Sequence, residues 1–175
     1  RASAIDERLG RVGQIDRIDT TVVANLIEDG FIPVIASVGG GDDGGSFNIN
    51  ADLVAGEIAS ALGAEKVIFL TDVDGLYADF ADKSSLISAL TLEEAEDLIG
   101  RGELASGMIP KVGACVKALH RGVERAHILN GTIPHALLLE IYTDEGIGTM
   151  ITGEHASLGL ADDATYAAYE GGVTL

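Results

Sequence analysis

The chain has 175 residues, of which 47% are hydrophobic and 22% are charged, and its formal net charge is −17. This composition argues against disorder over most of the length and suits one ordinary domain, or slightly more. The strong negative charge repels nucleic acids and anionic membranes, so neither is an expected partner. Because Cys115 is the single cysteine, no internal disulfide can form, and no apolar run reaches the roughly 18 residues of a membrane span. We therefore expect a cytoplasmic protein with Cys115 packed in its core.

The first part of the chain predicts short elements in alternation. They are a pair of strands joined by a turn (1–18), a helix capped by Asp19, Thr20 and Thr21 (22–28), a buried strand (32–38), a glycine-rich loop (39–46) and a helix (51–62). The strand at 32–38 is predicted from a short continuous apolar run. Pro33 is compatible with it because the first residues of a strand do not need to donate a hydrogen bond.

The second part of the chain predicts a regular alternation of strands and helices. In order, these are a buried strand (66–70), a loop (71–75), a polar connection (79–85), a helix from the capping box at 91–94 to about Gly100, a loop (102–107), a helix from Pro110 to His120, a strand (126–130), a turn (131–135), a short helix (136–142) and a closing strand (149–151). This alternation indicates an α/β fold with a mostly parallel sheet. In such sheets ligands bind at the carboxyl ends of the strands.

A first candidate site is the sequence Asn48-Ile49-Asn50-Ala51-Asp52, which joins an extended segment to a helix. Alternation places Asn48 and Asn50 on the same side, where their carboxamides can grip a carboxylate or an amide. Asp52 can only accept hydrogen bonds, so its natural partner is a cation. The alternative is that these residues only cap the helix and complement its dipole.

A second candidate site follows the strand at 66–70, where Thr71-Asp72 is followed by the turn sequence Asp74-Gly75. Such a turn could present backbone and side-chain groups to a nucleotide, and the two aspartates could equally bind Mg²⁺ directly. An ordinary Asp-Gly turn without a ligand explains the same residues.

A third candidate site is Gly107-Met108-Ile109-Pro110-Lys111. A lysine in the first turn of a helix is electrostatically unfavourable, because the positive end of the helix dipole lies there. An anion bridging Lys111 and the helix N-terminus would remove this objection, whereas a solvated lysine is the simpler alternative. The sequence contains neither a Walker-type lysine loop nor Gly-x-Gly-x-x-Gly after a strand.

Together and in this order, the three motifs resemble the amino acid kinase superfamily, and within it the acetylglutamate kinase family. The resemblance runs from about Arg8 to Ile151 and includes flanking stretches such as Arg11-Val12-Gly13 and Ile32-Pro33-Val34-Ile35. It implies a three-layer αβα fold with a mostly parallel central sheet. It also implies transfer of a phosphoryl group from MgATP to the side-chain carboxylate of N-acetyl-L-glutamate, a step of arginine biosynthesis.

The resemblance implies roles for individual residues. Asn48, with Asn50, would hold the substrate. Asp52 would orient lysines, and Lys111 would stabilise charge on the phosphoryl group during transfer. The cofactor would be ATP with Mg²⁺ held mainly through the phosphates, without a metal site made by protein side chains. The nucleotide would lie against Thr71, Asp72, Val73, Asp74, Gly75, Leu76, Tyr77 and Gly107.

The sequences at 135–141 and 146–150 resemble those of arginine-inhibited members of the family. This implies an effector site for arginine, with Glu140 and Gly148 as candidate residues. The alternative is a packed helix that carries one exposed acidic residue at Glu140.

Family members also carry an early lysine, glycine-rich phosphate loops and a substrate-binding arginine upstream of the matched segment, and nothing in 1–18 can supply them. We therefore expect a fold that is incomplete at its N-terminal side and inactive alone, from a homo-oligomeric full-length form. Its expected parts are the last part of an acetylglutamate-binding domain (1–62), a nucleotide-binding domain (63–152) and a flexible tail (153–175). Two alternatives stay open: a kinase for another small acid or for carbamate, and a non-catalytic module that binds arginine or nucleotide.

Overall fold

A computed structural model describes residues 1–79, 81–105, 107–143 and 146–153. Its centre is a four-stranded sheet in the order β5-β9-β10-β8, with β5 at one edge. The strands are β5 (Lys66–Thr71), β9 (Arg125–Asn130), β10 (Thr149–Thr152) and β8 (Ala89–Thr91). The pairs β5–β9 and β10–β8 are parallel, and only β9–β10 is antiparallel. The predicted mostly parallel sheet is therefore confirmed.

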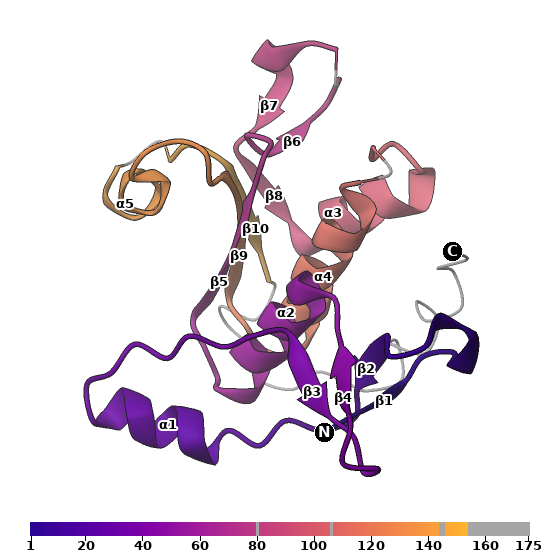
Figure 1. Cartoon of the computed structure of the whole chain (residues 1–175). Coiled ribbons are helices and arrows are strands. Elements are labelled where there is room, and N and C mark those ends of the chain that lie inside the picture. The colour runs from indigo at the N-terminus through magenta and orange to yellow at the C-terminus, as the bar shows by residue number, and fades with distance from the viewer. Residues whose placement is uncertain (80, 106, 144–145, 154–175) are drawn as a thin grey trace.

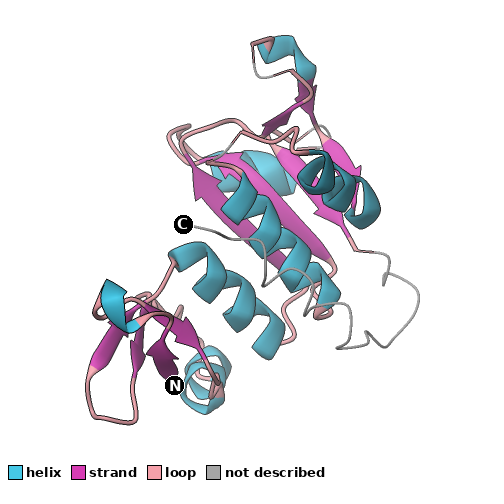
Figure 2. Cartoon of the chain, turned by 90° about the vertical axis from the view of Figure 1, so that its right-hand side faces the viewer, coloured by secondary structure: helices cyan, strands magenta, loops and turns pink. Residues whose placement is uncertain are grey.

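Helices cover both faces of this sheet and complete three layers. One face packs against α2 (Ala51–Ala61), α3 (Leu92–Arg101) and α4 (Ile109–His120), and the other against the short α5 (Ala136–Tyr142) (Figure 1). Figure 2 looks onto the first face and shows helices lying across the strands. The three-layer α/β architecture predicted from the sequence is confirmed.

Helix α4 forms the middle of the main core. Its residues Val112, Cys115 and Leu119 have no exposed surface, because they lie between the sheet and the neighbouring helices. Cys115 is thus a packed core thiol, as predicted, and burial raises the pKa of this thiol. An inert, protonated thiol has no role as a nucleophile.

Local sequence signals set the ends of the helices. Thr91 and Glu94 form the predicted capping box at the start of α3, and Gly102 ends α3 in the left-handed conformation. Pro110 occupies the first turn of α4, where a missing N–H costs nothing. Both helices were therefore predictable from their terminal residues.

The first residues of the chain form a small β unit beside α2 (Figure 1). Strands β1 (Ala2–Ala4) and β2 (Gly13–Ile15) pair antiparallel, as predicted, and η1 (Glu7–Leu9) lies between them. Strands β3 (Val38–Gly40) and β4 (Ser46–Asn48) form a hairpin, so the predicted loop at 39–46 is only partly a loop. Gly39 is required there, because a Cβ atom would lie 2.6 Å from the Cβ of Ala2.

The predicted buried strand at 32–38 is wrong in this structure. After α1 (Thr21–Glu28) the chain has no regular structure until β3 begins at Val38, and Ile32 and Val34 are 90% and 97% exposed. An apolar run becomes a buried strand only when a neighbouring strand pairs with it and another layer covers it. Within the described ranges no strand pairs with residues 32–36 and no layer covers Ile32 or Val34, and only the Ser37 carbonyl accepts a backbone hydrogen bond, from Ile49.

The polar connection predicted at 79–85 belongs to a hairpin that sequence patterns did not indicate. Strands β6 (Leu76–Tyr77) and β7 (Leu86–Ile87) pair antiparallel, with η2 (Lys83–Ser85) before β7. This hairpin projects from the sheet at the top of Figure 1. The predicted flexible tail lies outside the described residues, apart from Gly153. None of the helices in the described ranges is long and apolar enough to cross a membrane.

Candidate active site

The three sequence motifs meet at one end of the central sheet, where the strands β5 and β9 reach their carboxyl ends. Helix α2 leads into β5 and helix α4 leads into β9, and these two strands are parallel. Both helices therefore begin near the carboxyl ends of β5 and β9 (Figure 1). Asp52 at the start of α2, Lys111 at the start of α4 and the loop after Thr71 therefore lie at this end of the sheet. It is the position where α/β sheets bind ligands.

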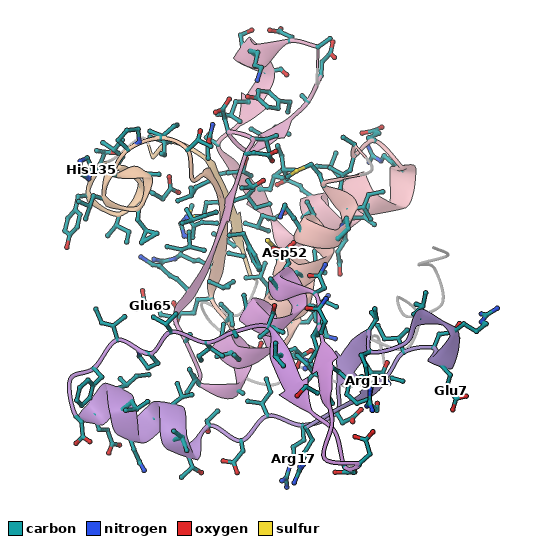
Figure 3. The ribbon with its side chains drawn as sticks, in the orientation of Figure 1. Glu7, Arg11, Arg17, Asp52, Glu65 and His135 are labelled. Atoms are coloured by element: carbon teal, nitrogen blue, oxygen red, sulfur yellow. The ribbon has the colours of Figure 1, made fainter. Side chains whose placement is uncertain are left out.

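Asp52 and Lys111 form an ion pair between α2 and α4 at this end of the sheet. Lys111 Nζ lies 3.1 Å from Asp52 Oδ2, and the two side chains are only 24% and 22% exposed. Close packing of α2 and α4 brings the two side chains together. This packing depends on Gly56 of α2, where a Cβ atom would lie 3.2 Å from the carbonyl oxygen of Ala114 in α4. Asp52 lies near the centre of the molecule in Figure 3. The pair holds a lysine at the positive end of a helix dipole, where it would otherwise be unfavourable.

The asparagines before Asp52 differ in what they contact. Asn50 Oδ1 accepts hydrogen bonds from the backbone nitrogens of Asp52 and Leu53, so it is the N-cap of α2, while its amide nitrogen can still donate. The Asn48 side chain is exposed and has no hydrogen-bond partner in the described part of the chain. Ile49 between them is buried, which agrees with the predicted alternation.

The loop after β5 is held in place through Asp74. Asn130 Nδ2 and the Tyr77 hydroxyl donate to this carboxylate at 2.7 and 2.6 Å, and Lys83 Nζ lies 3.8 Å away. The hydrogen bonds from Asn130 and then Tyr77 lower the pKa of the Asp74 carboxyl, and the same contact raises the pKa of Tyr77. By contrast, Asp72 is exposed, and within the described part of the chain its carboxylate receives only a 3.2 Å contact from the Thr71 hydroxyl. Asp72 is therefore more available to a ligand than Asp74.

The other end of the loop is fixed by Thr149 of β10, which is fully buried. Its hydroxyl accepts a hydrogen bond from the backbone nitrogen of Leu76 at 2.8 Å and donates to the carbonyl oxygen of Ile87 at 2.6 Å. Gly75 lies against the same hydroxyl, since a Cβ atom there would be only 2.5 Å from Thr149 Oγ1. The loop is thus tied to the sheet at both ends.

Three of these residues were not predicted. Asn130 is the last residue of β9, and its position at the carboxyl end of a strand beside β5 is a signal that sequence reading could have used. Thr149 and Lys83 carried no such signal, because their contacts depend on the β10 pairing and on the β6–β7 hairpin.

The start of α4 is open on its outer side. Among the described residues, its N-cap residue Met108 makes no side-chain capping bond, and a Cβ atom at Gly107 would have no neighbour within 4 Å. A helix start without a side-chain acceptor, with Lys111 in its first turn, suits an anionic group. Phosphate is the simplest anion that fits this arrangement.

A family model described as the amino acid kinase family matches residues 1–130. The chain belongs to the amino acid kinase family. Among its relatives, an acetylglutamate kinase from Thermosynechococcus vestitus is 54% identical over 152 residues, which are 87% of this chain and 52% of the relative. The acetylglutamate kinase from Halothermothrix orenii is 55% identical over 146 residues, covering 83% of this chain and 50% of that protein. This amino acid kinase chain therefore spans about half the length of these relatives.

A solved structure shows the same fold. The N-acetylglutamate synthase from Neisseria gonorrhoeae, in complex with coenzyme A and L-arginine, superposes with a TM-score of 0.75 at 32% identity. The match covers 83% of this chain and 33% of the synthase chain.

In this chain, the stretch at 135–141 and 146–150 contributes Glu140 to a second polar cluster, on the α5 face of the sheet. The Glu140 carboxylate lies 2.7 Å from His127 Nδ1 and accepts a hydrogen bond from the backbone nitrogen of Ile147 at 2.8 Å. Its side chain is 6% exposed, so the exposed acidic residue of the alternative interpretation is wrong. Gly148 packs against the carbonyl oxygen of Ile128 and leaves no space for a side chain. His127 Nε2 is buried without a hydrogen-bond partner among the described residues.

The charge balance of the candidate site limits what it can bind alone. It holds more carboxylates (Asp52, Asp72 and Asp74) than ammonium groups (Lys83 and Lys111), and Lys111 already faces Asp52. The described residues contain no group of three or more His, Cys, Asp or Glu side chains that could hold a metal ion. A triphosphate would therefore need cationic groups beyond those in the described part of this edge.

Proposed function

We propose that this chain carries the nucleotide-binding side of an enzyme that phosphorylates the side-chain carboxylate of N-acetyl-L-glutamate with ATP. The observation that carries the proposal is the Asp52–Lys111 pair at the carboxyl edge of the sheet, beside an open helix start and a fixed loop. The sequence identity of more than half to two acetylglutamate kinases supports the choice of substrate.

In the proposed reaction a carboxylate oxygen of N-acetyl-L-glutamate attacks the γ-phosphorus of ATP. The bond from that phosphorus to the bridging oxygen breaks, and ADP leaves. Lys111 stabilises the charge on the phosphoryl group during transfer, and Asp52 keeps its ammonium group aimed at the site. Such transfers depend on positioning and electrostatics more than on covalent chemistry by the protein.

Substrates are proposed to bind on either side of this pair. The adenine nucleotide lies along Thr71 to Tyr77 and Gly107, and the side-chain amides of Asn48 and Asn50 hold N-acetyl-L-glutamate. Mg²⁺, when bound, neutralises phosphate charge and is held mainly through the phosphates. Because the site has a surplus of carboxylates, we propose that the chain alone does not turn over substrate.

The Glu140 cluster is proposed to bind arginine as an effector. Its buried carboxylate and the unpartnered His127 Nε2 offer acceptors for a guanidinium or amino group. The structurally similar synthase from N. gonorrhoeae was solved with L-arginine, which supports this choice of ligand. Calorimetry should detect arginine binding that Glu140→Gln removes and that the exposed Glu65→Gln keeps. Equal binding by the two variants contradicts the assignment.

Acceptor profiling tests the proposed reaction. The chain is joined at Arg1 to the part of the T. vestitus enzyme that it does not match, and acyl phosphate is trapped as hydroxamate. N-acetyl-L-glutamate should give product, whereas carbamate and unacetylated L-glutamate should give little. Preference for another acceptor in a folded fusion would assign the chain to a different kinase of this family.

A further inference from the structure

Lys83 lies beside the loop that follows β5, on the β6–β7 hairpin that projects from the sheet (Figure 1). Its ammonium group is 3.8 Å from Asp74 Oδ2 and 5.3 Å from the centre of the Tyr77 ring. Asp74 and Tyr77 belong to the loop along which the nucleotide is proposed to bind. Lys83 therefore brings a positive charge to the nucleotide side of the candidate site, and the proposed reaction gives this charge no role.

The ion pair between Lys83 and Asp74 is loosely held. At 3.8 Å the two groups are too far apart for a hydrogen bond, and the Lys83 side chain is 79% exposed. Both oxygens of Asp74 already accept hydrogen bonds, from Asn130 Nδ2 and the Tyr77 hydroxyl. The carboxylate thus keeps these partners when the ammonium group moves away. Because water screens an exposed pair of this kind, Lys83 can exchange Asp74 for another anion at little cost.

The backbone that carries Lys83 is fixed by side-chain hydrogen bonds. The Asp82 carboxylate accepts from the backbone nitrogen and the hydroxyl of Ser84, at 2.8 and 2.7 Å. The Ser85 hydroxyl accepts from the backbone nitrogen of Asp79 at 2.9 Å and donates to the carbonyl oxygen of Asp82 at 2.7 Å. A mobile side chain on a fixed backbone can reach a ligand without rearrangement of the hairpin, which lowers the entropic cost of the contact.

The charges around the loop indicate which part of a nucleotide Lys83 would contact. A phosphate that approaches the loop meets the carboxylates of Asp72 and Asp74, which repel it. The ammonium group of Lys83 offsets this repulsion, and a lysine is a compact point charge that can pair with phosphate oxygens. The adenine base carries no charge and gains less from an ammonium group. A phosphate is therefore the better partner for Lys83.

We propose that Lys83 is a nucleotide-binding residue that leaves Asp74 and pairs with a phosphate of the bound nucleotide. This deepens the proposed function and rests on its nucleotide-binding part. Stabilisation of the phosphoryl group during transfer is assigned to Lys111, so Lys83 contributes equally to the ground state and the transition state. Such uniform binding changes the affinity for the nucleotide and not the rate at saturation.

MgADP binding tests the proposal, measured by calorimetry on the chain and on its fusion with the unmatched part of the T. vestitus enzyme. Lys83→Met removes the charge and should weaken binding about tenfold, as expected for the loss of one charge-assisted contact. Lys83→Arg keeps the charge and should restore most of the affinity. Lys66→Met is the matched control, because Lys66 begins β5, at the opposite end of the strand. Urea unfolding of Lys83→Met should match the unmodified chain, which shows that a contact and not the fold is lost.

Turnover by the fusion gives a second readout. Lys83→Met should raise the KM for MgATP about tenfold and leave kcat within about twofold. Equal MgADP binding by Lys83→Met and Lys66→Met, no rescue by Lys83→Arg, or no MgADP binding by either the chain or the fusion would each overturn the proposal. Weaker MgADP binding by Lys83→Met in a fusion that phosphorylates another acceptor would keep the role of Lys83 and refute the proposed function instead.

Discussion

Lys111 Nζ lies 3.1 Å from Asp52 Oδ2, although 59 positions separate the two residues in the sequence. The contact exists because α2 and α4 pack closely side by side, so that both helices present their first turns at the same edge of the sheet. The pair is partly buried and links two motifs that are each ambiguous alone.

This pair should be energetically coupled. A double-mutant cycle of Asp52→Asn and Lys111→Met should give a coupling free energy of about 1 kcal/mol, as expected for an ion pair that is partly shielded from water. Urea unfolding of the four proteins measures it. The exposed pair Asp97–Arg101 is the control and should give less, since its side chains are more than 60% exposed. Equal coupling in both pairs would contradict the shielding argument.

The hydroxyl of Thr149 should matter more than its methyl group. Thr149→Val removes the acceptor for Leu76 N–H and the donor to the Ile87 carbonyl, which should cost about 1–3 kcal/mol of unfolding free energy. Thr149→Ser keeps the hydroxyl and should cost clearly less. If chemical denaturation gives the same loss for both, packing rather than hydrogen bonding holds the loop.

Gly75 should not tolerate a side chain. Gly75→Ala places a Cβ atom 2.5 Å from Thr149 Oγ1, and we expect a loss of about 1–3 kcal/mol in thermal or urea unfolding. Gly100→Ala in α3 is the matched control, because a Cβ atom there meets none of the described residues within 4 Å. It should stabilise the chain by up to about 1 kcal/mol through helix propensity. A neutral Gly75→Ala would mean that the loop can move away from β10.

Asn130 should control the ionisation of Asp74. Its hydrogen bond is the main cause that lowers the pKa of Asp74, so Asn130→Ala should raise that pKa towards 3.8. The contribution of this contact to stability is present above the unfolded-state pKa and is lost as pH falls through the lower folded value. NMR titration of the carboxyl carbon measures the shift. Thr132→Ala, which leaves the Asn130–Asp74 contact in place, should leave the pKa unchanged.

Sequence reading predicted the elements that carry their own signals. The capping box at Thr91, the Pro110 start of α4 and the apolar strand at 66–70 are local features, and each formed as expected. The apolar run at 32–38 failed because burial of a strand depends on a partner, which its own residues cannot specify. The same limit applies to Thr149, whose role arises only when β10 pairs with β8 and β9.

The candidate site was predictable as a set of motifs but not as a geometry. Asp52, Lys111 and the loop at 71–77 were identified together through the family resemblance, and the topology then brought them to one edge. The cap formed by Asn50 and the support from Asn130 to Asp74 required the structure, because they depend on hydrogen bonds between side chains and specific backbone or side-chain atoms.

The most direct test uses the fusion of this chain with the unmatched part of the T. vestitus enzyme. Hydroxamate formation from MgATP and N-acetyl-L-glutamate is compared between the unmodified fusion and its Lys111→Ala variant. Removing one positioned charge from such a site should lower turnover about 100-fold or more. Lys66→Ala is the control, because Lys66 begins β5, at the opposite end of the strand from the candidate site. Its turnover should stay near that of the unmodified fusion. Turnover by Lys111→Ala within a few-fold of the unmodified fusion would contradict the role of Lys111 and, with it, the proposed active site.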